Sequence, residues 1–169
     1  MDRRIGLWQM AGFLFTSVVG TLLHFLYDWS GQNPVVGLFS GVNESIWEHM
    51  KLIYFPMLVF ALFQRRFWRG ENFWQIKLTG MVTALILIPA VYYTYTGALG
   101  ISVDWLNIGI FFLAAGVAYY REPKGFQGKA DSLLSSGAAL VVLLTIGILF
   151  WVFTFCLPGI PLFAAHSGE

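Results

Sequence analysis

Five long apolar stretches dominate this chain, and its basic residues collect in only some of the segments between them. The stretches cover about residues 5–27, 44–64, 73–98, 101–120 and 133–155. A helix of roughly 20 apolar residues is long enough to cross the hydrocarbon core of a bilayer. The sequence therefore predicts an all-α, integral membrane five-helix bundle that forms a single domain over residues 1–169.

The positions of the charged residues predict how this bundle is oriented. All but one of the ten lysines and arginines lie before the first stretch, around the second gap or in the fourth gap, and Lys51 is the exception. Basic loops stay preferentially in the cytoplasm, which places the N-terminus there and the C-terminus outside. Only 11% of the residues are charged, against about a quarter in soluble domains. We expect a multi-pass protein of the cell (inner or plasma) membrane, with the lipid bilayer as its surroundings.

The second stretch is too short unless it includes ionisable residues. Its uninterrupted apolar run covers only 52–63, so a spanning helix has to begin near Glu44. That start carries Glu48, His49 and Lys51 to the membrane boundary or below it. Ionisable groups at this depth are costly unless they are paired, solvated or bound to a ligand. The sequence thus predicts polar chemistry inside the bundle.

Polar residues on the other stretches reach the same depth. In the first stretch they recur at intervals of three or four residues and share one helical face, a stripe made of Ser17, Thr21, His24 and Asp28. The third and fourth stretches add Tyr92, Tyr93, Tyr95, Asp104 and Asn107. We therefore expect the first two stretches to be antiparallel neighbours, with His24 and Asp28 facing Glu48 or Lys51.

A metal site is the sharpest interpretation of this cluster. Two histidines with carboxylates offer nitrogen and oxygen ligands to a divalent metal such as zinc, and the predicted ligands are His24, Asp28, His49 and Glu48. Such a site could hydrolyse a lipid-like ester with Glu44 or Glu48 as the general base. The predicted substrate contacts are Asn43, Asp104, Lys51 and Tyr95. The spacing matches no known zinc-hydrolase signature.

Two other interpretations remain open. In the first, the cluster is structural in an accessory membrane subunit: Ser45 and Glu48 form a capping box, and Asp28 pairs with Lys51. In the second, the carboxylates form the ion relay of a small transporter, for which oligomerisation would have to supply a pathway. The interior on the cytoplasmic side is apolar apart from Gln9 and a few threonines, which favours a one-sided site. The cytoplasmic basic clusters fit the topology and anionic lipid, and they indicate no nucleic-acid partner.

Two connections between the stretches have distinctive compositions. Residues 31–42 are apolar but rich in Gly, Pro, Asn and Ser, which is typical of an ordered loop that folds back onto the bundle. After the last stretch, Pro158 and Pro161 prevent the helix from continuing, and the segment they begin carries His166 toward the outer polar residues.

The segment His24-Phe25-Leu26-Tyr27-Asp28-Trp29-Ser30-Gly31 and the following Asn43-Glu44-Ser45-Ile46-Trp47-Glu48-His49 form a specific pair of motifs. With Tyr93-Thr94-Tyr95 and Pro161-Leu162-Phe163, the chain resembles a family of small bacterial integral membrane proteins with no known activity. The resemblance covers most of the chain, and the residues after Phe163 depart from it. It implies the architecture and no mechanism.

Overall fold

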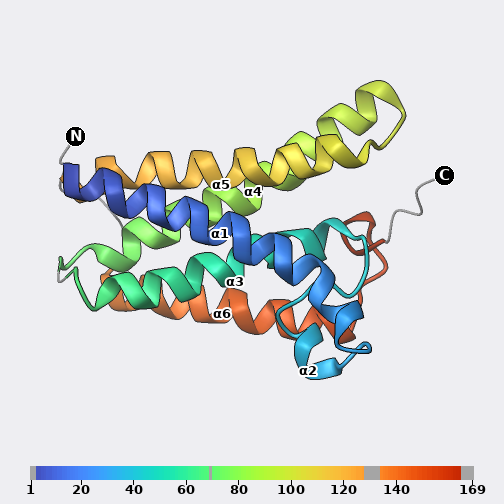
Figure 1. Ribbon diagram of the computed structural model, residues 1–169, viewed down its shortest axis with the longest axis horizontal. Helices are drawn as coiled ribbons and strands as arrows, with labels where there is room; N and C mark the ends of the chain where they lie inside the picture. Colours follow the sequence, from blue (N-terminus) through green and yellow to red (C-terminus); the bar gives the residue numbers. More distant parts are fainter. Residues whose placement is uncertain (1–2, 69, 128–133, 165–169) are drawn as a thin grey trace.

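The computed structural model describes residues 3–68, 70–127 and 134–164, and this part of the chain is all-α. Five long helices lie along one axis, each antiparallel to the next, and two short helical segments lie at one end (Figure 1). The elements are α1 (Arg3–Trp29), α2 (Pro34–Gly37), α3 (Ile46–Arg65), α4 (Phe73–Leu99), α5 (Asp104–Gln127), α6 (Ser136–Phe155) and the 3-10 helix η1 (Pro161–Phe163). We call the end where α1 finishes and α3 begins the histidine end, and the opposite end, where α1 begins and α3 finishes, the arginine end.

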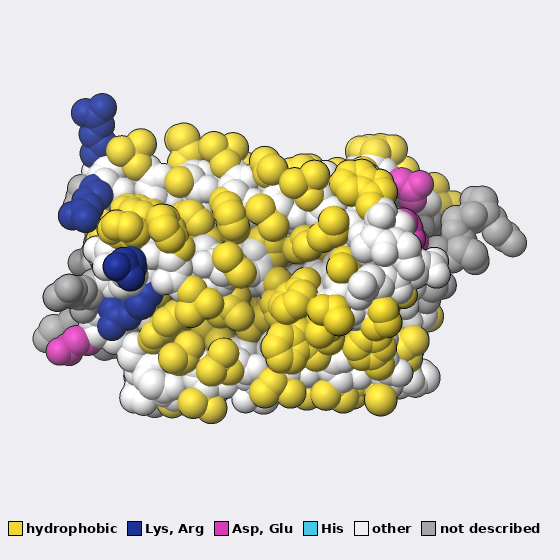
Figure 2. Space-filling model, turned by 60° about the horizontal axis from the view of Figure 1, so that its bottom comes forward, with side chains coloured by type: hydrophobic (Ala, Val, Ile, Leu, Met, Phe, Trp, Pro, Cys, Tyr) yellow, Lys and Arg dark blue, Asp and Glu magenta, His cyan; other side chains and the backbone are white. Residues whose placement is uncertain are grey.

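Four of the long helices, α1, α3, α4 and α6, are long and apolar enough to cross a membrane. On the face drawn in Figure 2, hydrophobic side chains spread over the flank of the bundle, and Lys and Arg side chains gather at the arginine end. Such a flank requires a lipid bilayer, so the chain is a multi-pass membrane protein. Helix α5 matches the predicted fourth span, but it continues past Tyr120 to Gln127 and has charged residues near both ends. The count of five spans and their orientation therefore stay predictions.

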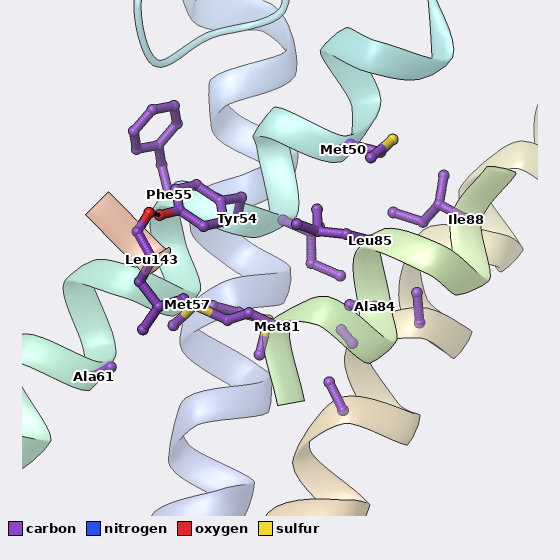
Figure 3. Packing of buried hydrophobic residues seen from close by; sticks show 14 of the residues in the cluster. Met50, Tyr54, Phe55, Met57, Ala61, Met81, Ala84, Leu85, Ile88 and Leu143 are labelled. Carbon is purple, nitrogen blue, oxygen red and sulfur yellow. Dashed lines mark hydrogen bonds between the residues drawn. The ribbon is translucent and has the colours of Figure 1, made fainter. Parts of the chain in front are cut away.

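Helix α3 is the central helix of the bundle. It contacts α1, α4, α5 and α6, and 72% of its most apolar window is buried, against 22% for α1. Tyr54 and Met57 of α3 pack with Met81 of α4 and Leu143 of α6 in the hydrophobic core (Figure 3). The Tyr54 hydroxyl donates a hydrogen bond to the Leu143 carbonyl. The middle of α3 is thus packed against α4 and α6, which fixes the axis on which its first turns lie.

The connection from α1 to α3 folds back onto the bundle, as the sequence predicts. The Asn33 side chain caps α2 by accepting a hydrogen bond from the Val35 amide at 2.9 Å. The Ser40 hydroxyl donates to the Leu23 carbonyl and accepts from the Tyr27 amide, which ties the connection to the last turns of α1. The start of α3 is thereby held beside the end of α1.

The segment after α6 also packs onto the histidine end. Helix α6 ends at Phe155, before the two prolines, as predicted. The ring of Phe163 in η1 is buried, with its centroid 4.8 Å from that of Trp47 and 5.5 Å from that of Phe153. His166, which the sequence places next in this segment, lies outside the described residues.

Candidate metal centre and ligand cavity

Two histidines and one carboxylate converge at the histidine end. Nε2 of His24, on α1, lies 3.9 Å from Oε1 of Glu44, and Nε2 of His49, on α3, lies 3.6 Å from Oε2 of Glu44. One ligand atom from each of the three residues can be chosen so that all lie within 4.8 Å of one another. Donors that share one tetrahedral zinc ion at about 2.1 Å lie about 3.4 Å apart. Side-chain movements of about 1–1.5 Å would therefore bring these donors onto a single ion.

The turn before α3 holds His49 in an orientation suited to metal binding. Nδ1 of His49 lies 2.9 Å from the carbonyl oxygen of Ser45, and because a carbonyl only accepts, Nδ1 carries the proton. In the neutral ring the second nitrogen, Nε2, then has the lone pair that a metal needs, and it lies 3.6 Å from Oε2 of Glu44. Asn43 supports this turn, since its Oδ1 accepts from the Ser45 amide at 2.9 Å. A carbonyl partner on the second ring nitrogen is the usual support of a histidine ligand.

The three residues lie at the mouth of a cavity of about 800 Å³ enclosed by α1, α3, α4 and α5. The volume is within the range of about 300–1,000 Å³ that is typical of small-molecule sites. Most polar side chains of the lining lie toward the histidine end, and the polar lining residues are Thr21, His24, Glu44, His49, Tyr92, Ser102, Asp104 and Asn107. The deeper lining is apolar and includes Leu52, Ile88, Ile110 and Phe111. The cavity therefore has a polar mouth and an apolar interior.

A glycine on α1 sets the depth of the cavity. A Cβ atom at Gly20 would lie 2.6 Å from Cζ of Phe111 and 2.7 Å from the carbonyl oxygen of Leu52. The missing side chain thus lets Phe111 of α5 and the backbone of α3 approach α1 closely. Nearer the arginine end, Oγ1 of Thr16 and the Tyr119 hydroxyl lie 2.9 Å apart and join α1 to α5. The cavity consequently ends in packed side chains on this side.

The residues of α4 and α5 that the sequence predicts as substrate contacts differ in whether they line the cavity. The Tyr95 hydroxyl donates to Oδ1 of Asn107 at 2.5 Å, and Nδ2 of Asn107 donates to Ser102 at 3.2 Å. These bonds brace the loop between α4 and α5, and Tyr95 is not part of the lining. Asp104 starts α5, lines the cavity and is exposed, and it forms no ion pair within the described part of the chain.

Glu48 and Lys51 lie on another face of α3 and are fully buried in a separate network. Nζ of Lys51 lies 2.5 Å from Oε2 of Glu48, and it donates to the Gly37 carbonyl at 2.7 Å and to the Thr154 hydroxyl at 2.9 Å. Glu48 also accepts from the Val42 amide at 3.0 Å and from Thr154 at 3.2 Å. The three hydrogens of the ammonium group each have an acceptor. This network fastens α3 to α2 and α6.

These positions differ in part from the sequence-based expectation. Glu44, rather than Glu48 or Asp28, is the carboxylate beside the two histidines. Asp28 is exposed one turn beyond His24, and Lys51 pairs with Glu48 rather than with Asp28. The predicted capping box forms only in one direction: the Ser45 hydroxyl accepts from the Glu48 amide at 3.3 Å, whereas the Glu48 carboxylate binds the Val42 amide. Glu48 and His49 reach different neighbours because adjacent residues of a helix point about 100° apart. Helices α1 and α6 lie on different sides of α3 (Figure 1), so His49 meets α1 whereas Glu48 meets α6.

Sequence reasoning missed a buried ion pair at the arginine end. Nζ of Lys77 lies 2.6 Å from Oε2 of Glu122, and both side chains are at most 1% exposed. The Lys77 ammonium also lies 5.7 Å from the ring centroids of Phe73, Tyr119 and Phe126. The sequence does not predict this pair, because its apolar pattern ends the fourth stretch at 120 and therefore puts Glu122 in a loop. The isolated acid within the basic segment 121–129 was the available signal.

The fold and the cavity define an all-α multi-pass membrane protein with a group of metal-capable side chains at one end. The chain belongs to DUF6512, a family of unknown function, which it matches over residues 3–168. Comparisons with curated proteins and with solved structures found no match.

Proposed function

We propose that the protein binds a divalent metal ion such as zinc through His24, Glu44 and His49, and that the adjoining cavity holds a lipid-like molecule. The observation that carries this proposal is the convergence of the three donors at the mouth of an apolar cavity. Two imidazole nitrogens and one carboxylate oxygen suit zinc and leave a coordination position for a ligand. An ion at this mouth would hold the polar head of a molecule whose apolar part occupies the interior.

We further propose that the histidine end faces outward and that all five long helices span the membrane. The support is the collection of Lys and Arg at the arginine end, which the positive-inside tendency assigns to the cytoplasm (Figure 2). Helix α5 has 24 residues, so it is long enough to cross despite its charged ends. In this orientation the metal site and the cavity mouth lie at the outer surface.

We propose binding rather than hydrolysis, because neither Glu48 nor Glu44, the two general bases predicted from the sequence, is available for that role. Glu48 is held by Lys51, Thr154 and a backbone amide, and the proposed metal site uses Glu44 as a ligand. Asp104 is the remaining carboxylate in the cavity lining. An ion relay across the membrane is less well supported than one-sided binding, since packing around Gly20 and Phe111 ends the cavity.

Measurement of the metal content of the purified protein tests the proposal. The full chain, extracted in mild detergent and exposed to zinc, is expected to retain about one equivalent after desalting. His24→Ala and His49→Ala should each lose the metal, whereas Asp28→Asn should retain it, since Asp28 is an exposed acid at the same end outside the group of three. A wild-type protein without zinc, or equal zinc in both histidine variants, would refute the metal site.

A further inference from the structure

The cavity has exposed apolar walls on two facing helices. Phe25 on α1 and Ile108 on α5 line it, although their exposed fractions are 46% and 58%. Each has a second lining residue one helical turn away, Thr21 on α1 and Phe112 on α5, and both of these are also exposed. Residues that line a cavity and are also exposed form its rim. The cavity therefore opens sideways between the outer halves of α1 and α5.

The two helices close together again toward the arginine end. There, Oγ1 of Thr16 and the Tyr119 hydroxyl are 2.9 Å apart, and Tyr119 packs where a Cβ at Gly12 would stand. Near the histidine end α1 and α5 diverge (Figure 1). The opening is thus a wedge on the apolar flank of the bundle, where acyl chains rather than water surround the protein.

We propose that a single-chain phospholipid enters the cavity from the bilayer through this opening, which we call the α1–α5 opening. This inference rests on the proposed metal site, because the phosphate would bind the ion held by His24, Glu44 and His49. The acyl chain would lie along Leu52, Ile88 and Phe111. An acyl chain that moves from lipid into the cavity gains little from burial, because both surroundings are apolar, so recognition depends on the head.

Two observations restrict the ligand to this class. The cavity of about 800 Å³ has the size of a site for one drug-sized molecule, which favours one chain over two. The Asp104 carboxylate faces the same mouth and makes no ion pair with another described residue. A carboxylate there accepts hydrogen bonds from hydroxyl groups, which a fatty acid lacks, so a phosphate with a hydroxylated substituent fits better than a fatty acid.

Lipid binding in nanodiscs tests this inference separately from the metal site. The zinc-loaded full chain is mixed with oleoyl lysophosphatidylglycerol, and bound lipid is measured by native mass spectrometry while zinc is measured in the same sample. The expected result is one bound lysolipid per chain, with at least tenfold weaker retention of oleate and of dioleoyl phosphatidylglycerol. Equal retention of oleate would overturn the assignment of the head, and equal retention of the two-chain lipid would overturn the single-chain assignment.

A pair of variants on α5 tests the route. Ile108→Trp enlarges a rim residue, and Leu113→Trp enlarges an exposed residue of the same helix that does not line the cavity. Ile108→Trp should slow uptake of a fluorescent lysolipid at least tenfold at unchanged zinc content, whereas Leu113→Trp should behave as wild type. Equal uptake by the two variants would overturn the α1–α5 opening. Zinc binding without lysolipid binding would overturn this inference and leave the metal site standing, while loss of zinc from the wild type would refute both.

Discussion

The first turns of α3 contribute to two groups of ionisable side chains, which differ in burial and in partners. Glu48 and Lys51 have fully buried side chains that are joined to each other. His49, between them in the sequence, is 25% exposed and lies with His24 and the 60% exposed Glu44 beside a cavity. The buried pair has used its hydrogen-bonding capacity on the protein, whereas the exposed group has donors left for a ligand. Neighbouring polar residues of one helix can therefore serve stability and binding separately.

The largest expected effect comes from breaking the buried pair. Glu48→Leu leaves the Lys51 ammonium inside the bundle without its counter-charge, and such losses cost about 3–5 kcal/mol. The free energy of unfolding, measured by denaturant titration in mixed micelles, should fall by that amount. The double variant Glu48→Leu with Lys51→Met removes both charges and should recover most of the loss. If the double variant is as unstable as Glu48→Leu alone, the pair is not the reason for the effect.

The ion pair at the arginine end tests whether burial rather than location determines this behaviour. Lys77→Met leaves the buried Glu122 carboxylate without its partner and is expected to cost about 3 kcal/mol in the same titration. The matched control is Lys124→Met, which removes an exposed cation from the same end and should change stability by less than about 0.5 kcal/mol. Similar losses of stability in Lys77→Met and Lys124→Met would show that burial does not determine the cost of removing the cation.

The sequence predicted the regions that contain these groups better than it predicted their partners. Span positions and charge segregation follow from local hydrophobicity, which the bilayer makes decisive, and the short second stretch correctly required polar residues at the start of α3. The choice between Glu44 and Glu48 as the neighbour of the histidines depended on where α6 and the connection around α2 would pack. Thr154, which completes the buried network, lies in an apolar stretch that carries no local sign of an inward-facing hydroxyl.

A smaller effect is expected from the hydroxyl that joins α6 to the buried pair. Thr154→Val keeps the shape of the side chain but removes one acceptor of Lys51 and one donor to Glu48, at a cost of about 1–3 kcal/mol. Thr145→Val is the control, since the Thr145 hydroxyl is exposed and bonds only within its own helix, to Val141. A Thr154→Val protein as stable as this control would remove α6 from the network.

The smallest effect on stability is expected for substitution of His49, which belongs to the exposed group beside the cavity. His49→Ala removes a partly exposed ring with one hydrogen bond to its own turn, so the free energy of unfolding without metal should change by less than about 1 kcal/mol. Added zinc should stabilise the wild type and leave His49→Ala unchanged, because only a protein that binds the ion gains stability from it. A loss of several kcal/mol without metal would assign His49 to the structural group instead.

Zinc X-ray absorption spectroscopy of the loaded, full-length protein tests the central claim most directly. We expect nitrogen and oxygen neighbours at about 2.0–2.1 Å, with outer-shell scattering from two imidazole rings. His24→Ala should reduce that scattering to one ring or abolish zinc binding, and Asp28→Asn should leave the spectrum unchanged, since Asp28 is an exposed acid outside the group of three. Zinc bound without imidazole scattering, or a spectrum altered by Asp28→Asn and not by His24→Ala, would contradict the assignment of His24, Glu44 and His49 as the metal site.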